Sequence, residues 1–499
     1  MMLFFSWLLP VGASILFLIL VFYLRPRKLH LPPGPKPWPI IGNFHLISSL
    51  PHQSIHHLSQ KYGPIMQLQF GSFPVVVASS SDMAKQFLKV HDLNFASRPR
   101  SSVGLYTAYD HSNIVFSPYN PYWRYARKIC SMQLFNTTRL DSYEYIRVEE
   151  MQNFLSDIYA SCGKAIPFRD HFSNITLNNI TRIVLGKTFL GGTQSEEFKK
   201  MLKEMFFLAG VLNIGDFIPW LDFLDLQGYV KRFKAVAKSI EEFLEGELNE
   251  HIARKHVDSQ EDMLDVLLKL SDDPNADVKL SRNQIKNITM DLLAGATDTS
   301  TTVIEWAMCE ILKRPEVFRR ATEELDRVIG RGRWVEEQDI SNLPYIKAIL
   351  YETMRMHPVS PLLAPHLARE NCKIQGYDIV QGTQVLVNVS SIGRDPTLWD
   401  APNEFRPERF IGRDIDVRGQ HFELLPFGSG RRMCPGYNLG LKLTECGIAN
   451  ILHGFSWELP NLMNPQDLDM GEVWGLTVSR KVQLLVVPQP RLPAHVYMM

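Results

Sequence analysis

The chain has 499 residues, 53 basic and 53 acidic side chains, 45% hydrophobic residues and 6 cysteines. Zero net charge argues against a nucleic-acid binder held by bulk basicity, and the hydrophobic and charged fractions exclude a largely disordered chain. The cysteines are too few for a disulfide scaffold, and because none forms a C-x-x-C pair, a structural zinc site or dithiol redox motif is not expected.

The N-terminal residues 3–24 carry no charge and as a helix reach about 33 Å, enough to cross the hydrocarbon core of a bilayer. Arg25, Arg27 and Lys28 follow directly, and by the positive-inside rule they stay in the cytosol with the rest of the chain. A cleaved signal peptide would place its basic residues first, so a transmembrane signal anchor is the favoured interpretation. Residues 25–43 continue as a basic, proline-rich hinge that is stiff and extended.

Residues 44–499 contain no second linker, repeat or low-complexity tract, which favours one domain over the three or so that length alone suggests. A β-hairpin is predicted for the segments 65–70 and 73–78. The predicted fold class is mainly α with a minor β part. Its other predicted elements are helices at 198–210, 240–256 and 315–329, and short strands at 384–387 and 482–487.

The longest predicted helix begins at a capping box formed by Ser281 and Gln284 and continues to about Arg314, just before Pro315. Its flanks are apolar, yet residues 297–302 read TDTSTT. Polar β-branched residues are weak helix formers, and their hydroxyls can bond back to the backbone. A polar break in the middle of such a helix indicates a functional site.

The strongest local motif is the segment 427–436, FGSGRRMCPG, in which glycines surround a single cysteine, Cys434. A helical pattern follows from Leu439, so Cys434 lies near a helix N-terminus, where backbone N–H groups favour its thiolate. Such a thiolate can serve as a nucleophile or as a metal ligand. The other five cysteines are interpreted as buried, inert side chains.

This motif, F-x-x-G-x-R-x-C-x-G, resembles the haem-binding signature of the cytochrome P-450 monooxygenases. The resemblance runs from the proline-rich hinge to about Pro488 and is strongest to the plant microsomal branch that includes flavonoid 3'-hydroxylases. It implies the cytochrome P-450 fold, one large haem domain, and an anchor in the endoplasmic reticulum membrane with the catalytic domain facing the cytosol. It also implies Cys434 as the axial thiolate on haem iron, with Phe427, Gly430 and Gly436 as further cofactor-binding residues.

Pro435 has a physical consequence for this thiolate, because proline removes the first backbone N–H after the cysteine. Only Gly436 and later amides can then donate to the sulfur, so we expect a more electron-donating thiolate than with a non-proline residue at 435. A thiolate ligand pushes electron density onto iron and favours O–O cleavage.

The resemblance assigns the two haem propionates to cationic or hydrogen-bonding side chains. Trp123 and Arg127 share one face of a predicted helix, and Arg432 lies two residues before the cysteine. His366 and Arg98 match two further contacts of the family.

A second expected cluster is structural. Glu352 and Arg355 share a helix face, and the resemblance pairs them with Arg409 in a buried network that braces the haem-side core. Loss of one member would leave a buried charge unpaired, at a cost of roughly 3–5 kcal/mol.

The polar break of the long helix resembles the oxygen-binding motif of the family, with Asp298 and Thr299 as its acid–alcohol pair. Splitting dioxygen needs two protons, and a carboxylate and a hydroxyl acting through water can deliver them. Ala296 departs from the usual glycine, and its methyl group is expected to narrow the groove over the haem.

By the same resemblance the substrate is a lipophilic small molecule. Phenylpropanoid or flavonoid hydroxylation is the favoured activity; terpenoid oxidation, including homoterpene formation, and steroid or brassinosteroid hydroxylation are the alternatives. The candidate pocket residues are Tyr106, Phe116, Phe207, Phe217, Ala296, Leu362 and Trp474.

Electrons must come from outside the domain, because no flavin or nicotinamide motif accompanies it. The expected partner is a membrane-bound NADPH–cytochrome P-450 reductase, with Lys128 and Arg431 as candidate basic contacts, and no nucleic acid is expected. Rival interpretations are a haem-thiolate isomerase or dehydratase, and a non-catalytic haem-bearing ligand binder. Asp298 and Thr299 argue against both, since neither protein would deliver protons to dioxygen.

Overall fold

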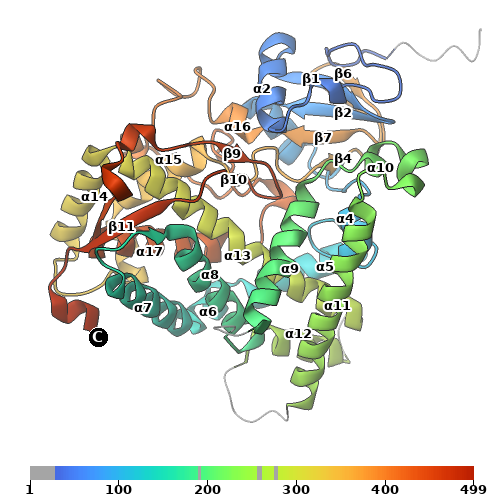
Figure 1. Ribbon diagram of the computed structural model, residues 1–499. Coiled ribbons are helices and arrows are strands. Elements are labelled where there is room, and N and C mark those ends of the chain that lie inside the picture. The colour runs from blue at the N-terminus through green and yellow to red at the C-terminus, as the bar shows by residue number, and fades with distance from the viewer. Residues whose placement is uncertain (1–28, 189–192, 255–260, 275–278, 499) are drawn as a thin grey trace, which may run out of the picture.

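The computed structural model describes residues 29–188, 193–254, 261–274 and 279–498, and it confirms a mainly helical fold with a small β part (Figure 1). The helices are α2 (Pro51–Tyr62), α3 (Ser81–Lys85), α4 (Ser102–Thr107), α5 (Pro121–Ile129), α6 (Thr137–Ser142), α7 (Glu144–Ala160), α8 (Phe168–Leu185), α9 (Thr193–Gly210), α10 (Ile214–Phe217), α11 (Tyr229–Ala253), α12 (Met263–Asp272), α13 (Arg282–Leu312), α14 (Pro315–Val328), α15 (Pro344–Met356), α16 (Val389–Ile392) and α17 (Tyr437–Gly454). The strands are β1 (Ile65–Phe70), β2 (Phe73–Ala78), β3 (Ile166–Pro167), β4 (His366–Leu367), β5 (Cys372–Ile374), β6 (Tyr377–Ile379), β7 (Gln384–Val387), β8 (Phe455–Glu458), β9 (Glu472–Val473), β10 (Ser479–Arg480) and β11 (Leu485–Pro490).

The largest sheet joins segments that are far apart in the sequence, in the order β1-β2-β7-β4. The hairpin β1–β2 and strand β7 have the predicted bounds, and β7 runs parallel to β2 with Gln384 opposite Val75. The strand predicted at 482–487 lies slightly further along as β11. It pairs with β8 from Val487 opposite Glu458 onward, so the partner strand rather than the local apolar pattern sets its bounds.

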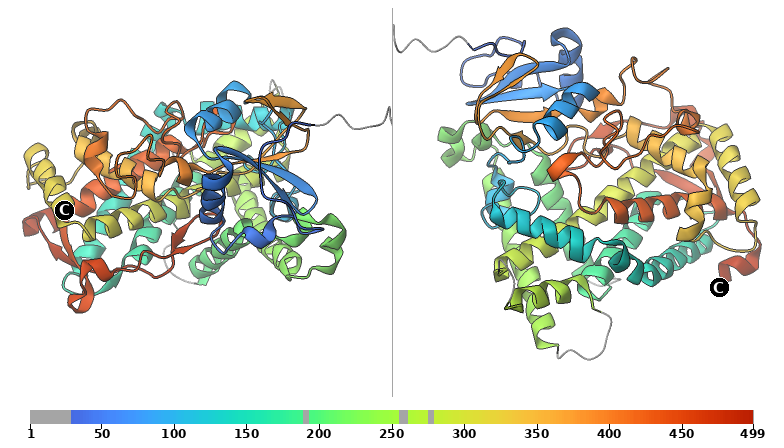
Figure 2. Two further views of the ribbon diagram at one scale, coloured as in Figure 1. Left: turned by 90° about the horizontal axis from the view of Figure 1, so that it is seen from above. Right: turned by 180° about the vertical axis from the view of Figure 1, so that it is seen from behind.

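Helix α13 crosses the middle of the molecule and packs against α8, α15 and α17 (Figure 2). The predicted capping box is confirmed: Ser281 Oγ accepts from Gln284 N at 3.3 Å, and Ser281 N donates to Gln284 Oε1 at 2.9 Å. The helix ends at Leu312, and Pro315 opens α14 as predicted. Because its apolar flanks are buried on several sides, α13 brings the polar break 297–302 into the core.

Two predicted helices extend further toward their N-termini than their sequence pattern indicated. Helix α9 begins at Thr193 rather than near residue 198, and α11 begins at Tyr229 rather than near residue 240. In α11 the buried side chains Phe233 and Val236 continue the apolar spacing upstream, so this face is fixed by packing against α13 and α9.

The predicted anchor, residues 3–24, lies outside the described residues. Among the residues that the structure describes, no helix is both long and apolar enough to cross a bilayer. The described part of the hinge is extended and then folds back on itself, because Trp38 and Gly42 exchange two backbone hydrogen bonds of 3.0 Å.

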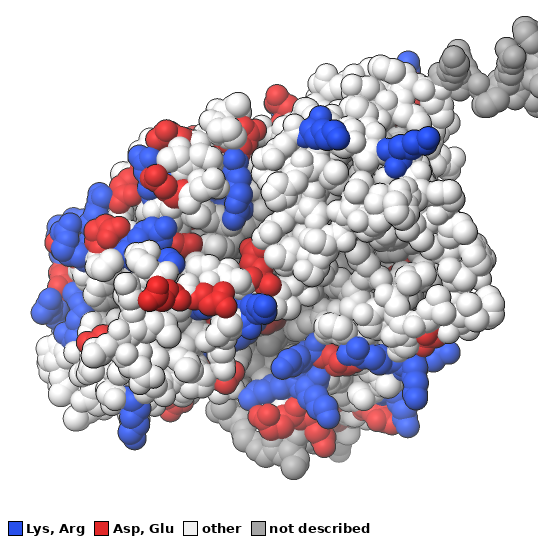
Figure 3. All heavy atoms as spheres, turned by 45° about the horizontal axis from the view of Figure 1, so that its top comes forward, with Lys and Arg blue, Asp and Glu red and all other residues white. Residues whose placement is uncertain are grey.

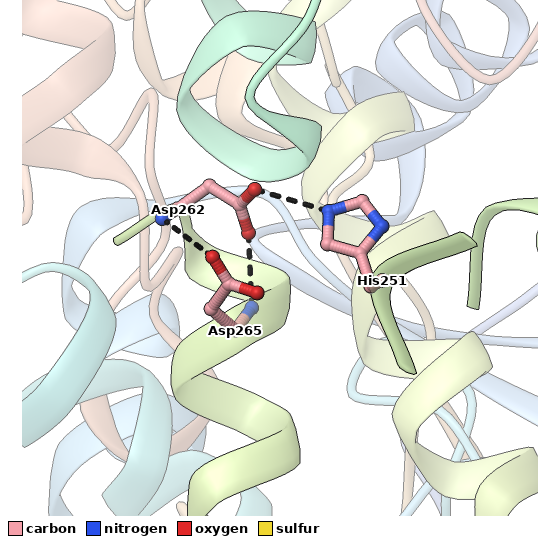
Figure 4. A group of neighbouring side chains, drawn as sticks. All are labelled: His251, Asp262 and Asp265. Carbon is pink, nitrogen blue, oxygen red and sulfur yellow. Dashed lines mark hydrogen bonds and ion pairs between the residues drawn. The ribbon is translucent and has the colours of Figure 1, made fainter. Parts of the chain in front are cut away.

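One cluster of potential metal ligands, His251, Asp262 and Asp265, lies between the end of α11 and the start of α12 (Figure 4). Asp262 Oδ1 accepts from Asp265 N at 2.9 Å and caps α12, while Asp262 Oδ2 contacts His251 Nε2 at 3.0 Å. His251 Nδ1 donates to the carbonyl of Glu247 at 2.8 Å. Helix capping and one buried ion pair therefore use these atoms, and we assign the cluster a structural role.

Candidate active site

A buried cavity of about 340 Å³ lies between α13 on one side and the cysteine loop, α5 and α17 on the other. All but one of the residues predicted for cofactor binding converge on it, from four separate segments of the chain. Those that line the cavity are Arg98, Trp123, Arg127, His366, Phe427, Arg432, Cys434 and Gly436, with Ala296 and Thr299 of α13 opposite.

The cysteine loop is shaped by its own backbone. Cys434 N donates to Phe427 O at 2.9 Å, which closes the loop before α17 starts at Tyr437. Gly430 has φ +68°, and a Cβ atom there would lie 2.2 Å from the carbonyl oxygen of Leu88. Gly430 was predicted to bind the cofactor, but it does not line the cavity. It serves the site through the shape of the loop rather than through a contact.

The electrostatics at the sulfur agree with the expectation for Pro435. Burial raises the pKa of the Cys434 thiol, while the Gly436 N–H group and the charge of Arg127 act in the opposite direction. The first amide after the cysteine that faces the sulfur is therefore that of Gly436. This arrangement is suited to a ligand whose negative charge is stabilised by metal coordination rather than by solvent.

We expect Pro435→Ala to raise the reduction potential of the haem-loaded protein, because the new amide N–H at 435 can donate to the sulfur and withdraw electron density from it. Spectroelectrochemical titration checks this, with Tyr437→Phe at the start of α17 as a nearby control that leaves the backbone amides unchanged. A potential equal to that of the wild type would contradict the effect.

One rim of the cavity is strongly cationic. Arg98, Arg127 and Arg432 line it, and within the described residues no carboxylate lies within ion-pair distance of them. Burial, reinforced by the neighbouring guanidinium groups, lowers the pKa of Arg432 to about 8, and burial lowers that of Arg98 to about 10. Cations that are buried or half-buried without a counter-charge favour an anionic ligand, and the two propionates of haem fit this rim.

The loop 114–117 holds two of these cations, Arg98 and Arg432, in place. Trp123 Nε1 and Arg432 Nη1 both donate to Ile114 O, at 3.0 and 3.2 Å, and Arg98 Nε donates to Val115 O at 3.1 Å. The loop is fixed in turn by Asp291 of α13, which accepts from Ile114 N at 2.6 Å. Burial raises the pKa of Asp291 to about 7, and the sequence offered no signal for this residue beyond an acid in an apolar helix.

His366 lies in the cavity wall as a neutral side chain. Burial, together with the charges of Arg98 and Arg432, lowers its pKa to about 3. Its Nδ1 donates to Phe95 O at 2.8 Å, which leaves Nε2 as an acceptor. Contact with a carboxylate therefore requires the ring to turn, so the predicted propionate contact is weaker here than for the arginines.

The predicted charge network is brought together in the core. Arg355 Nε and Nη2 bind the two carboxylate oxygens of Glu352 at 2.6 and 2.7 Å, and Arg409 Nε binds Glu352 Oε1 at 2.9 Å. The side chains of Glu352 and Arg355 are 0% exposed and that of Arg409 is 6% exposed. Other N–H groups of the Arg355 and Arg409 guanidiniums donate to backbone carbonyls, so the network ties α15 to the segment 393–409.

The side chains in and beside the polar break of α13 face in two different directions. Ala296, Thr299 and Ser300 line the cavity, but Asp298 does not. Asp298 instead binds Arg169 of α8 and the hydroxyl of Thr477, and sequence reasoning missed Arg169 because no motif surrounds it. Thr299 Oγ1 donates to Gly295 O at 2.8 Å, and the methyl group of Ala296 adds to the cavity wall as expected.

A second chamber of about 210 Å³ adjoins the first, and the two share wall residues such as Val115, Ser360 and Leu476. Among the predicted pocket residues, Phe116, Phe217, Leu362 and Trp474 line this outer chamber.

Tyr106 and Phe207, which were also predicted to line the pocket, lie outside both chambers. Tyr106 stacks on Phe233, and Phe207 is 42% exposed beneath the guanidinium of Arg232. Tyr106 of α4 and Phe207 of α9 thus both contact side chains of α11.

The cavity and its rim define a haem-thiolate protein: the cysteine loop offers the ligand and the unpaired cations offer partners for the propionates. Three comparisons with known proteins agree. The family model for Cytochrome P450 matches residues 32–486. A structure of zebra fish cytochrome P450 has the same fold, with a TM-score of 0.75 at 24% identity over 88% of this chain and 100% of that chain.

Among curated proteins, Trimethyltridecatetraene synthase of Zea mays is 46% identical over 95% of this chain and 91% of that protein. Dimethylnonatriene synthase of Zea mays is 42% identical over 95% and 93%, and Flavonoid 3'-monooxygenase of Petunia hybrida is 43% identical over 96% of each chain. The chain belongs to the cytochrome P450 family and is a cytochrome P450 monooxygenase.

Proposed function

We propose that the protein hydroxylates or otherwise oxidises a small lipophilic plant metabolite, using O2 and electrons from NADPH through a separate reductase. The observation that carries this proposal is the placement of Cys434 across one cavity from the polar break of α13. Haem, when bound, would supply dioxygen activation. Cys434 Sγ would hold its iron, and Arg98, Arg127 and Arg432 would hold its propionates, while α13 lines the cavity opposite the cysteine loop.

The chemistry of the outer chamber supports an apolar substrate. Its wall is mostly aliphatic and aromatic, and several of its polar side chains are already engaged. Asp216 accepts from the amide and the hydroxyl of Ser102 at 2.7 and 2.6 Å, and Arg98 donates to three backbone carbonyls. A polyhydroxylated ligand would leave some hydroxyls unpaired, at about 1–3 kcal/mol each.

We therefore favour a terpenoid with few hydroxyl groups over the flavonoid that the sequence first favoured. The relatives at 46% and 42% identity, named as synthases of a tridecatetraene and a nonatriene, support a hydrocarbon-like substrate. Flavonoid hydroxylation is the second candidate, supported by the flavonoid 3'-monooxygenase relatives and by the aromatic walls Phe116, Phe217 and Trp474.

The test is a panel of terpene alcohols, flavonoids and steroids incubated with microsomes that contain the protein and a plant reductase, with products identified by mass spectrometry. We expect NADPH- and O2-dependent products from terpene alcohols and weaker turnover of flavonoids. Faster turnover of flavonoids would reverse the substrate assignment. Conversion that continues without O2 and NADPH would favour the isomerase or dehydratase interpretation.

We also propose that the protein lies on the endoplasmic reticulum membrane through the anchor 3–24, with the body in the cytosol. Exposed apolar side chains support this orientation: Trp38 and Ile40 of the hinge are 58% and 63% exposed, and Phe223 is 82% exposed. The segment around Phe223 follows α10, which binds the β1–β2 turn through Ser72 N and Phe217 O at 2.8 Å. Figure 3 shows few charged side chains on the upper right of the molecule, where these elements lie.

The reductase would dock over the outer side of the cysteine loop. A shallow groove there is lined by Arg124, Arg127, Lys128 and Arg431. Arg431 is already paired with Asp92 at 2.5 Å, so of the two predicted contacts Lys128 is the better candidate, together with exposed Arg124. An acidic reductase surface complements these cations.

A further inference from the structure

We propose that Thr477 is a catalytic residue whose hydroxyl carries protons from Asp298 into the active-site cavity, with Arg169 as the residue that positions Asp298. The inference rests on the proposed function, because it concerns proton supply to the same cavity. It assigns a role to a loop residue outside the acid–alcohol pair of α13.

The first observation is that Asp298 reaches the cavity only indirectly. Its Oδ1 atom binds Arg169 Nη2 at 2.5 Å, and its Oδ2 atom accepts from Thr477 Oγ1 at 2.5 Å. Asp298 does not line the cavity, whereas Thr477 does. Thr477 is therefore the hydroxyl that connects this carboxylate to the space in front of the cysteine loop.

The second observation is that the neighbouring hydroxyl of Thr299 has a different partner. Thr299 Oγ1 donates to Gly295 O at 2.8 Å, within its own helix. Both hydroxyls line the cavity, but within the described residues only that of Thr477 has a hydrogen bond to an acid. Thr299 can bind a water molecule in the cavity, while Thr477 can exchange a proton with Asp298.

The third observation is that the Thr477 hydroxyl is held in a fixed position. The next residue, Val478, donates its N–H to Val359 O at 2.9 Å and accepts from Trp306 Nε1 at 3.3 Å. On the other side, Leu476 N donates to Phe206 O at 3.2 Å. Contacts to three separate segments keep the loop in place, and they therefore also keep the Thr477 hydroxyl at hydrogen-bond distance from Asp298.

One arginine lies between Asp298 and a second carboxylate. Arg169 is shared between Asp298 and Glu305, which it binds through Nη1 at 2.7 Å. Burial alone would lower the pKa of the Arg169 guanidinium, but these two carboxylates raise it, so Arg169 stays charged. One cation between two carboxylates leaves a net charge of −1, and a single added proton neutralises the cluster.

The transfer balances without any redox step. A proton from solvent reaches the Asp298 carboxylate, whose side chain is 22% exposed. Protonated Asp298 passes this proton from Oδ2 to Thr477 Oγ1, while Thr477 releases its own hydroxyl proton to a water molecule in the cavity. Asp298 is again a carboxylate, Thr477 is again a neutral hydroxyl, and one proton has moved from solvent to the cavity.

The test compares Thr477→Val, which keeps the shape and removes the hydroxyl, with Thr477→Ser, which keeps the hydroxyl. Thr289→Val is the matched control, since the Thr289 hydroxyl is buried on α13, the helix that carries Asp298, and donates only to Ile285 O. In haem-loaded enzyme we expect product per NADPH to fall at least about tenfold in Thr477→Val, with peroxide rising in step. Thr477→Ser and Thr289→Val should stay within about twofold of the wild type.

A second readout needs no substrate. The infrared C–O stretch of carbon monoxide bound to the ferrous protein reports hydrogen-bond donors beside the ligand, and we expect it to rise in Thr477→Val but not in Thr289→Val. If the wild type turns over nothing in the substrate panel, the proposed function fails while this spectrum still tests the placement of Thr477. An unchanged stretch in Thr477→Val overturns the inference.

A double-variant cycle tests whether the two residues act as one path. If Thr477 and Asp298 form a single relay, the double variant that combines Asp298→Asn and Thr477→Val should lose no more product per NADPH than the worse single variant. Losses that multiply would show two independent routes and would overturn the relay.

Discussion

Replacing Cys434 by serine is expected to abolish monooxygenase activity while leaving the fold intact. The cavity presents the Cys434 sulfur at the start of α17, with the Gly436 N–H group directed at it. A serine hydroxyl is a poor substitute for a thiolate, which supplies the electron density that favours O–O cleavage. Loss of a residue that only supports a metal ligand already lowers metal affinity or activity about 10–100-fold. Loss of the ligand itself should therefore lower activity by more than about 100-fold.

The measurement is the absorption spectrum of the ferrous carbon monoxide complex together with turnover of the best substrate. Cys130→Ser is the matched control, because Cys130 lines the same cavity. Burial raises the pKa of Cys130 to about 12, so its thiol stays neutral. A thiolate-type spectrum in Cys434→Ser, or its loss in Cys130→Ser, would show that the wrong cysteine has been assigned to the iron.

The sequence could predict those parts of the site that a local pattern encodes. Cys434 and its glycines lie within ten residues of one another, and Glu352 and Arg355 are one helical turn apart, so each group can be identified before the fold is known. The capping box at Ser281 and the proline at 315 likewise set the bounds of α13. The structure brings these groups together as expected, and the family comparison agrees with the resemblance.

Features that depend on tertiary packing could not be predicted in the same way. Arg169 and Thr477 meet Asp298 from far upstream and far downstream in the chain. No motif surrounds Arg169, and the family resemblance, which places Thr477 in a pocket-lining loop, gives no sign of its contact with Asp298. The family resemblance predicts Tyr106 and Phe207 in the pocket, because both lie in stretches that line it in the family. Which side of α4 and α9 faces the chamber depends on how α11 packs against them, and that packing turns both side chains away.

Glu352→Ala is expected to give little haem-loaded protein, through loss of stability rather than loss of a contact to haem. The side chain is fully buried and binds Arg355 through both carboxylate oxygens, with Arg409 and the amide of Arg406 as further partners. Its removal leaves two buried guanidinium groups without their counter-charge. Breaking a buried pair in this way costs roughly 3–5 kcal/mol, a large part of the 5–15 kcal/mol that stabilises a typical protein.

The haem-to-protein ratio after purification and the midpoint of thermal unfolding measure this effect. Glu404→Ala is the control, since its carboxylate is 68% exposed while its backbone carbonyl, which accepts from Arg355 and Arg409, is unchanged. A surface change of this kind should alter the free energy of unfolding by no more than about 0.5 kcal/mol.

The two arginine variants should differ in severity. Because the Arg409 side chain is 6% exposed against 0% for Arg355, Arg409→Ala should destabilise the fold less than Arg355→Ala. Normal haem loading of Glu352→Ala would mean that backbone carbonyls alone can hold both guanidinium groups, and the network would then be dispensable for the fold.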